Sequence, residues 1–209
     1  MTDPARAPVD RHRAATRQRT TKETAVSVAL DLDGSEGKVH AATGLPFFDH
    51  MLDQLGRHGG FDLTVEAQGD LHVDGHHTVE DVAIVVGECF REALGDKAGV
   101  RRYASGAFPL DEALVEVALD LSGRPFVAYD VPFGDVLPLG DPPFNPEMAE
   151  HFFHTFATQA GITLHVRLRA GRNTHHVVEA TFKGVARSLR DAVRVEGAGV
   201  PSTKGTLSA

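Results

Sequence analysis

Two segments of the chain carry the same pattern, His-His-x-x-Glu, at residues 76–80 and 175–179. Histidine is the commonest metal ligand in proteins and titrates close to neutral pH. Residues four apart on a helix share a face, so the first histidine of each pattern and its glutamate can chelate one ion. The pattern therefore predicts metal binding by imidazole and carboxylate groups on two helices.

Other histidines near the two patterns enlarge this set. Adjacent helical residues point about 100° apart, so His77 and His176 should serve a different ion or a substrate. Upstream, His50 precedes the first pattern and His151 the second, at nearly equal spacing. We therefore predict two metal sites rather than one. The candidate ligands are His50, His76, His77, Glu80, His151, His175, His176 and Glu179.

The types of ligand limit the metal. Cys89 is the only cysteine, which excludes a thiolate site, and mixed imidazole and carboxylate ligation suits Mn, Fe or Zn. Asp74 and Asp81 flank the first pattern, and we expect them to orient its imidazoles. A single His-His-x-x-Glu is more often an exposed helix start. Its recurrence at corresponding places favours the metal sites.

The chain also repeats itself in the elements that must position these side chains. Residues 26–34 read VSVALDLDG and residues 115–123 read VEVALDLSG, and both alternate like half-buried strands. Each is followed by an extended piece, a helix after proline (46–58 and 146–159), a β-rich run and a long amphipathic helix. The order β-β-α-β-α thus occurs twice.

This repeat predicts an α+β fold with an internal duplication, in which each half is a roughly four-stranded sheet packed with two helices. We expect the halves to form one compact unit. The predicted segments are a mobile N-terminal arm (1–15), a first half (16–99), a second half (100–196) and a C-terminal tail (197–209).

Composition excludes several classes of function. The chain has 209 residues, of which 42% are hydrophobic and 24% charged, as in ordinary globular proteins. It contains no apolar run of membrane length and no apolar leader, so we expect a cytoplasmic protein. The net charge of −8 argues against general binding of nucleic acid or anionic membranes.

Eight motifs extend the argument to a known family, because the sequence resembles the imidazoleglycerol-phosphate dehydratases along most of its length. The motifs are RTTKET (19–24), PFFDHMLDQL (46–55), DGHHTVED (74–81), PLDEAL (109–114), LDLSGRP (119–125), EHFF (150–153), HHVVEATFK (175–183) and PSTKG (201–205).

The resemblance implies a lyase of histidine biosynthesis that dehydrates D-erythro-imidazole-glycerol phosphate to imidazole-acetol phosphate. It implies two Mn(II) ions per subunit that bind the substrate imidazole as imidazolate, and a 24-subunit cage with its sites at subunit interfaces. The family's ligand positions match the eight residues above. Glu23 and Glu179 are implied as the proton-transfer residues.

The substrate contacts are implied in the same way. They are Gln54, Arg102, Arg124, Lys183, Ser202 and Lys204, with the tail 197–209 ordering around the phosphate. By the repeat, Asp111 and Glu112 mark the position equivalent to Glu23. The other histidines, including His58, are expected to be structural or surface residues, and Cys89 to be buried.

Two alternatives remain open. A dinuclear metallohydrolase would use similar ligands, but two ions about 4 Å apart usually share a bridging carboxylate, and no shared aspartate is evident. A metal-storage or metal-stapled cage would lack a specific phosphate pocket. The native ion, the sharing of ligands between chains, and the order of proton transfers are also open.

Overall fold

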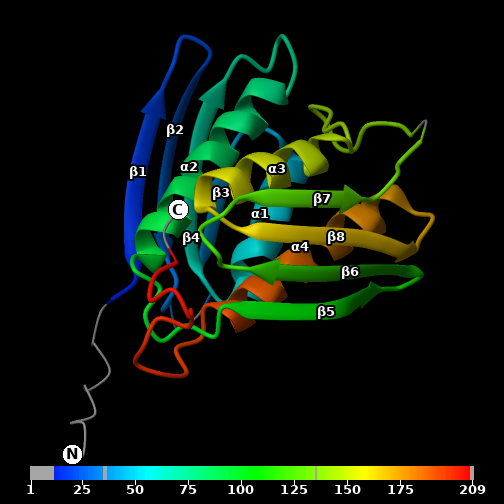
Figure 1. Ribbon diagram of the computed structural model, residues 1–209. Coiled ribbons are helices and arrows are strands. Elements are labelled where there is room, and N and C mark those ends of the chain that lie inside the picture. Colours follow the sequence, from blue (N-terminus) through cyan, green and yellow to red (C-terminus); the bar gives the residue numbers. More distant parts are fainter. Residues whose placement is uncertain (1–11, 35–36, 135, 208–209) are drawn as a thin grey trace, which may run out of the picture.

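The computed structural model describes residues 12–34, 37–134 and 136–207 of the chain, and within them it contains eight strands and four helices (Figure 1). The first half consists of β1 (Ala14–Thr20), β2 (Thr24–Asp31), β3 (Val39–Ala42), α1 (Pro46–Gly59), β4 (Asp62–Gly69) and α2 (His76–Leu94). The second consists of β5 (Tyr103–Leu110), β6 (Ala113–Asp120), β7 (Phe126–Asp130), α3 (Met148–Ala160), β8 (Thr163–Ala170) and α4 (Thr174–Ala192).

Both halves have the same sheet topology. The strand orders are β1-β2-β4-β3 and β5-β6-β8-β7. In each sheet the last pair, β3 with β4 and β7 with β8, is parallel and the others are antiparallel. The predicted α+β class, the duplication, and the four-stranded sheets with two helices each are thus confirmed.

The first strand of each half is absent from the predicted order β-β-α-β-α. In β1 only Ala15 is buried, and in β5 no residue is fully buried. Edge strands of this kind lack the alternating apolar pattern that identifies a half-buried strand in sequence. Strand β1 begins at Ala14, inside the segment predicted as an arm, and residues 1–11 of that arm lie outside the described residues.

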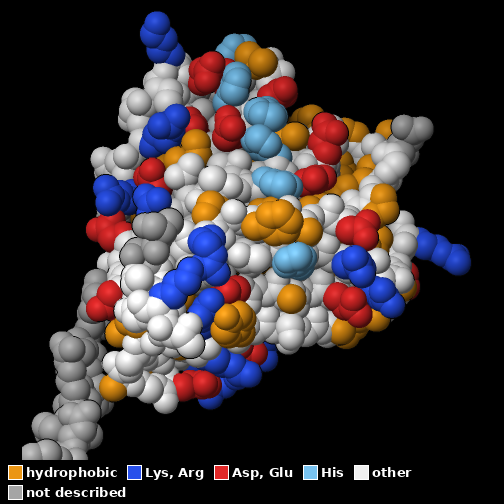
Figure 2. All heavy atoms as spheres, viewed as in Figure 1, with side chains coloured by type: hydrophobic (Ala, Val, Ile, Leu, Met, Phe, Trp, Pro, Cys, Tyr) orange, Lys and Arg blue, Asp and Glu red, His pale blue; other side chains and the backbone are white. Residues whose placement is uncertain are grey.

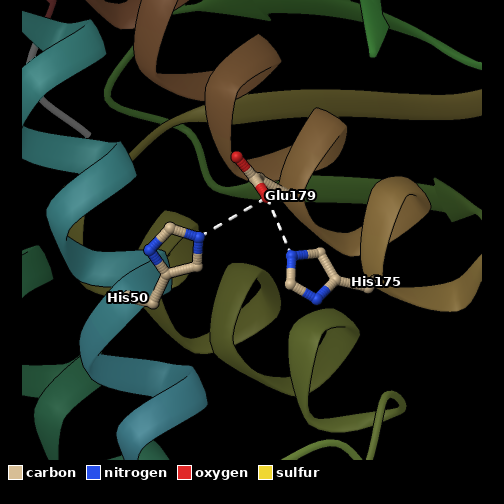
Figure 3. A group of neighbouring side chains, drawn as sticks. All are labelled: His50, His175 and Glu179. Carbon is tan, nitrogen blue, oxygen red and sulfur yellow. Dashed lines mark hydrogen bonds and ion pairs between the residues drawn. The ribbon is translucent and has the colours of Figure 1, made fainter. Parts of the chain in front are cut away.

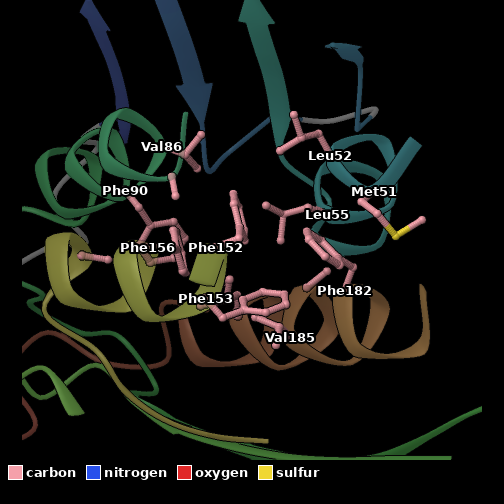
Figure 4. Close-up of a cluster of buried hydrophobic side chains, with 14 of the residues drawn as sticks. Met51, Leu52, Leu55, Val86, Phe90, Phe152, Phe153, Phe156, Phe182 and Val185 are labelled. Atoms are coloured by element: carbon pink, nitrogen blue, oxygen red, sulfur yellow. The ribbon is translucent and has the colours of Figure 1, made fainter. Parts of the chain in front are cut away.

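The core lies between the two sheets, where the helices of both halves meet (Figures 1 and 4). Helix α1 packs against α4, and α2 against α3, while each half's helices also cover its own sheet. Phe152, Phe153 and Phe182 are fully buried where the helices meet. Burial of each such side chain stabilises the fold by roughly 1.5–3 kcal/mol. The helix interface therefore joins the two halves firmly.

Gly87 allows α2 and α3 to approach closely. A Cβ atom at this position would lie 2.7 Å from the carbonyl oxygen of Phe156 and from the Cβ of Gln159. Contacts of this kind fix the two helix axes at short range and bring the residues at their ends together. Within the described chain, no helix has both the length and the apolar character required to span a membrane.

Candidate metal centre

Two candidate metal clusters contain the histidines and glutamates of the repeated pattern, and the first consists of His50, His175 and Glu179 (Figure 3). The Oε2 atom of Glu179 lies 3.0 Å from Nε2 of His175 and 3.5 Å from Nε2 of His50. His50 comes from α1 and the other two residues from α4. Two imidazole nitrogens and one carboxylate oxygen thus converge on one point, as a divalent metal site requires.

The second cluster contains His76, Glu80 and His151, from α2 and α3. Nε2 of His151 lies 3.4 Å from Oε1 of Glu80, and the rings of His76 and His151 are 4.4 Å apart between centroids. This Nε2 atom is buried, and no hydrogen-bond partner is found for it in the described part of the chain. A buried polar atom without a partner is unfavourable, and a bound cation would satisfy it.

Each cluster combines residues of both halves. His50 of the first half joins the His-x-x-x-Glu pair of the second half, and His151 of the second half joins the pair of the first. The exchange follows from the packing of α1 on α4 and of α2 on α3. Spacing along the chain cannot reveal this exchange, because along the chain each upstream histidine is nearest to the pattern of its own half.

A polar side chain accepts hydrogen bonds from the first backbone N–H groups of both ligand-bearing helices. Asn173 caps α4, and its side chain accepts hydrogen bonds from the backbone N–H groups of His175 and His176. Asp74 accepts from the backbone N–H of His76 at 2.8 Å. These hydrogen bonds satisfy N–H groups that the first turn of a helix leaves free.

The expected roles of Asp74 and Asp81 are wrong. Asp74 bonds to backbone rather than to an imidazole. Asp81 is buried and accepts hydrogen bonds from the Thr24 hydroxyl and from Nε of Arg19, the latter at 2.8 Å. Asp81 follows Glu80 directly, so its side chain points about 100° away from that of Glu80 around the helix and faces the sheet.

His77 and His176 lie outside both clusters, and each has a carboxylate at its Nδ1 atom. Nδ1 of His77 is 3.0 Å from Asp70, and Nδ1 of His176 is 2.7 Å from Glu112. These hydrogen bonds, as the main cause, raise the pKa of both imidazoles, and the bond to His176 lowers the pKa of Glu112 to about 2. Each bond leaves Nε2 as the atom available to a ligand.

Asp70 and Glu112 were thus not assigned to the imidazoles by sequence. Glu112 carries a weak signal, since the repeat makes it equivalent to Glu23. Glu23 itself is exposed, and its Oε2 lies 3.9 Å from Nε2 of His77. Asp70 follows β4 without any pattern that marks it.

Glu179 lies close to a lysine as well as to the two histidines of its cluster. Its Oε1 lies 2.5 Å from Nζ of Lys183, one turn along α4. Burial raises the pKa of Glu179, but the hydrogen bond and charge of Lys183, with His175 and His50, outweigh burial and hold the pKa below its usual range. The corresponding place in α2 is Ile84, so the clusters differ in charge.

A hollow of about 630 Å³ collects most of the predicted phosphate contacts. It is lined by Arg102, Tyr103, Arg124, Pro201, Ser202, Thr203 and Lys204. Arg102 bonds to Asp120 at 2.7 and 3.0 Å and donates to the carbonyl oxygen of Pro201 at 2.7 Å, which ties the C-terminal segment to this place. Lys183 does not line the hollow and lies at the first cluster instead.

On the face shown in Figure 2, histidine side chains gather in a row beside acidic ones, over the region of α2 and α3. Gln54 lies next to His50, with its Nε2 3.4 Å from the Nδ1 atom of that histidine. His58, expected at the surface or in a structural role, lies 3.2 Å from the same amide. Cys89 is buried, as predicted.

Comparisons with known proteins agree on one family. The family model of imidazoleglycerol-phosphate dehydratase matches residues 43–189. A protein with that name from Acidothermus cellulolyticus is 58% identical over 196 residues, which cover 93% of each chain. Another from Streptomyces coelicolor is 51% identical over 193 residues, covering 91% of this chain and 96% of the other.

Two solved structures show the same similarity. The imidazoleglycerol-phosphate dehydratase of Staphylococcus aureus aligns with a TM-score of 0.77 and 35% identity over 87% of this chain and 99% of its own. The enzyme of Pyrococcus furiosus, in complex with (S)-C348, aligns with a TM-score of 0.77 and 35% identity over 91% and 100%. The chain, with its duplicated sheets and its two histidine–glutamate clusters, therefore belongs to the imidazoleglycerol-phosphate dehydratase family, the hydro-lyases of histidine biosynthesis.

Proposed function

We propose that the chain dehydrates D-erythro-imidazole-glycerol phosphate to imidazole-acetol phosphate in the cytoplasm, with two Mn(II) ions per subunit. The observation that supports this most is the convergence of His50, His175 and Glu179, and of a second such trio, in a chain of this family. The ligand atoms of each trio lie within 4.8 Å of one another. The donors are nitrogen and oxygen only, which suits Mn(II).

Mn(II) bound at these clusters supplies Lewis acidity, which favours loss of a proton from the substrate imidazole. The chain's own residues then have three tasks. They hold the phosphate, they orient the glycerol carbons, and they move two protons. One proton leaves C2 of the substrate, and another must reach the hydroxyl that departs from C3.

Glu23 and Glu179 are the proposed proton-transfer residues. Glu179 is 12% exposed and is held by Lys183 through Oε1, which leaves Oε2 toward the cluster. Glu23 lies beside His77 and belongs to neither cluster of its own chain. If His77 completes a cluster of a neighbouring subunit, Glu23 lies beside that cluster as well, because it is next to His77. The two carboxylates would then meet across an interface, on either side of the substrate.

Assembly follows from the same geometry. Each cluster offers three ligands, fewer than the six that Mn(II) usually takes in an octahedral site. His77 and His176 are partly exposed, and the Nδ1 atom of each contacts a carboxylate. Neither residue belongs to one of the two clusters within the described part of its own chain. We infer that they complete clusters of neighbouring subunits in a 24-subunit cage. A lone subunit would then be inactive.

The hollow at the start of the second half is the proposed phosphate site. Arg124, Ser202 and Lys204 line it beside Arg102. Arginine binds phosphate with paired donors and lysine adds a positive charge. Because Arg102 is already bonded to Asp120 and to the Pro201 carbonyl, its role includes holding residues 197–207 in place. Lys183 contributes its charge from the first cluster.

The test is an assay of the Mn(II)-loaded protein on imidazole-glycerol phosphate, with the ketone product and free phosphate measured in parallel. We expect ketone without phosphate release. Lys204→Ala should chiefly raise KM, because it removes a phosphate contact and leaves the clusters intact. Phosphate release without ketone would identify a metallohydrolase. Metal uptake with neither product, and indifference to Lys204→Ala, would identify a storage cage.

A further inference from the structure

Three side chains on one face of α1 form a continuous hydrogen-bonded row. His50, Gln54 and His58 are spaced four residues apart, so they are stacked along the helix. Nε2 of Gln54 lies 3.4 Å from Nδ1 of His50, and Oε1 of Gln54 lies 3.2 Å from Nε2 of His58. Gln54 is 9% exposed. Both ends of its amide are therefore engaged by imidazoles.

The orientation of this amide determines where the proton of His50 lies. With the Gln54 nitrogen toward His50, Nδ1 must accept, and the neutral ring carries its proton on Nε2. The inverted amide fills the same volume and reverses both bonds. Its oxygen accepts the proton of Nδ1, and Nε2 keeps a free lone pair. Only the second state lets His50 bind a metal through the atom that faces Glu179.

The same chain shows how other candidate ligands solve this problem. Asp70 and Glu112 sit at Nδ1 of His77 and His176 at 3.0 and 2.7 Å. An ionised carboxylate can only accept, so it holds the ring proton on Nδ1. Metal-binding histidines commonly donate their second N–H in this way. At His50 the corresponding partner is an amide, which can donate or accept and so needs a second partner to orient it.

We propose that Gln54 is a positioning residue, whose amide oxygen holds the proton of His50 on Nδ1 while His58 binds the amide nitrogen, so that Nε2 of His50 is free for the metal. The resemblance implied a substrate contact for Gln54, and this role differs from it. The inference rests on the proposed function, because it concerns the metal at the first cluster.

His58 is suited to accept the amide N–H. Burial lowers its pKa, and the positive charges of Lys183 and Arg187 lower it further, against the smaller opposing effect of Glu179 and Asp53. A neutral imidazole has one ring nitrogen that accepts. At the second cluster, the positions four and eight residues after His151 are Thr155 and Gln159, so the row is confined to the first cluster.

The test measures Mn(II) binding by the assembled, substrate-free protein, with free Mn(II) followed by electron paramagnetic resonance. Gln54→Leu keeps the size of the side chain but removes the acceptor. We expect it to weaken one of the two Mn(II) sites about 10- to 100-fold. Gln54→Glu should bind within about twofold of wild type, because a carboxylate accepts from Nδ1 in either orientation. Gln159→Leu is the matched control and should change neither site.

His58 is tested by a double-mutant cycle. His58→Phe should weaken the same site in the wild-type background, because the amide loses the partner that orients it. In the Gln54→Glu background it should have no effect, since the carboxylate needs no orientation. Retained binding of the second Mn(II), whose ligands from the same chain lie on α2 and α3, shows that each variant is folded.

The outcomes separate this inference from the proposed function. If wild-type protein binds no Mn(II), both fail. If wild-type protein binds two ions and forms ketone but Gln54→Leu binds both ions equally well, only the inference fails. Equal weakening by Gln54→Glu and Gln54→Leu would also overturn it, because that result indicates packing rather than a proton acceptor.

Discussion

Glu179 and Glu80 occupy equivalent places but have different partners. Lys183 holds Oε1 of Glu179 at 2.5 Å, while His175 and His50 approach Oε2. Oε1 of Glu80 lies 3.4 Å from Nε2 of His151, and Ile84 occupies the position in α2 that is equivalent to Lys183 in α4. A cation on one oxygen leaves the other as the only oxygen of Glu179 that is free to bind a metal. The two clusters therefore differ in charge, because Lys183 adds a positive charge beside the first and no lysine occupies the equivalent position beside the second.

Glu179→Gln tests this difference. The substitution keeps the shape of the side chain but removes the negative charge to which we assign metal binding and proton transfer. We expect kcat to fall by at least about 100-fold, the range of general acid–base catalysis, and bound Mn(II) to fall from two ions to one. Metal analysis and steady-state kinetics measure both effects. Glu150→Gln, at an exposed site on α3 where Glu150 is paired with His154, should retain activity and both ions.

Elements far apart in sequence are tied together at the start of β1. Nη1 of Arg13 donates to the carbonyl oxygen of Val193 at 2.6 Å, just after α4, and Nη2 contacts Asp33 at 2.6 Å. The hydrogen bond from Arg13, as the main cause, lowers the pKa of Asp33. The first sheet is thus fastened to the end of the last helix through one guanidinium group.

Asp33→Asn should therefore reduce stability at neutral pH and not in acid. Because the folded pKa of Asp33 is lowered, its contribution is present above the unfolded value, about 4, and is lost as pH falls through the folded value. We expect a loss below about 1 kcal/mol at pH 7, since Asp33 is part-exposed. Denaturant unfolding at pH 7 and pH 3 measures the difference between wild type and variant.

The control for this measurement is Asp130→Asn. Asp130 is paired with Arg167 at 3.3 Å within the second sheet, where both side chains are exposed. Its loss should change stability little at either pH. A difference for Asp33→Asn that is equally large at pH 3 would contradict the assignment to an ionised carboxylate.

Much of the fold could be predicted from sequence, because its signals are local. The strand repeats around Val26 and Val115 and the helices that begin with the histidine patterns are readable from spacing alone. The exchange of His50 and His151 between halves could not be predicted, since it depends on which helices pack together. The same holds for Asp70 and for the row that ends at His58, where neighbours meet only after folding.

At the scale of the whole molecule, the two clusters act as links between the halves. His50 on α1 meets Glu179 on α4, and His151 on α3 meets Glu80 on α2. An ion in either cluster would bind the folded molecule and not the unfolded chain. Such an ion at 100 times its Kd contributes about 2.7 kcal/mol to stability.

Removal of metal should therefore lower Tm, abolish dehydration, and release smaller oligomers from the proposed cage. Thermal unfolding and light scattering with and without a chelator measure these changes, and added Mn(II) should reverse them. The Glu80→Gln/Glu179→Gln variant is the control, because the chelator should affect it little. Unchanged Tm and full activity after exhaustive chelation would refute the metal sites.

The exchange of histidines has a further consequence for how such a chain can arise. A half-length polypeptide with one sheet and two helices would carry every type of ligand. Its upstream histidine, equivalent to His50 or His151, would nevertheless lie away from the histidine and glutamate of its own second helix. It could complete a trio only by associating with a second copy, and both trios would then be identical. After fusion of the two copies into one chain, each half can mutate without the other. Lys183 and Ile84 occupy equivalent positions in the two halves, and a difference of this kind is possible only in the fused chain.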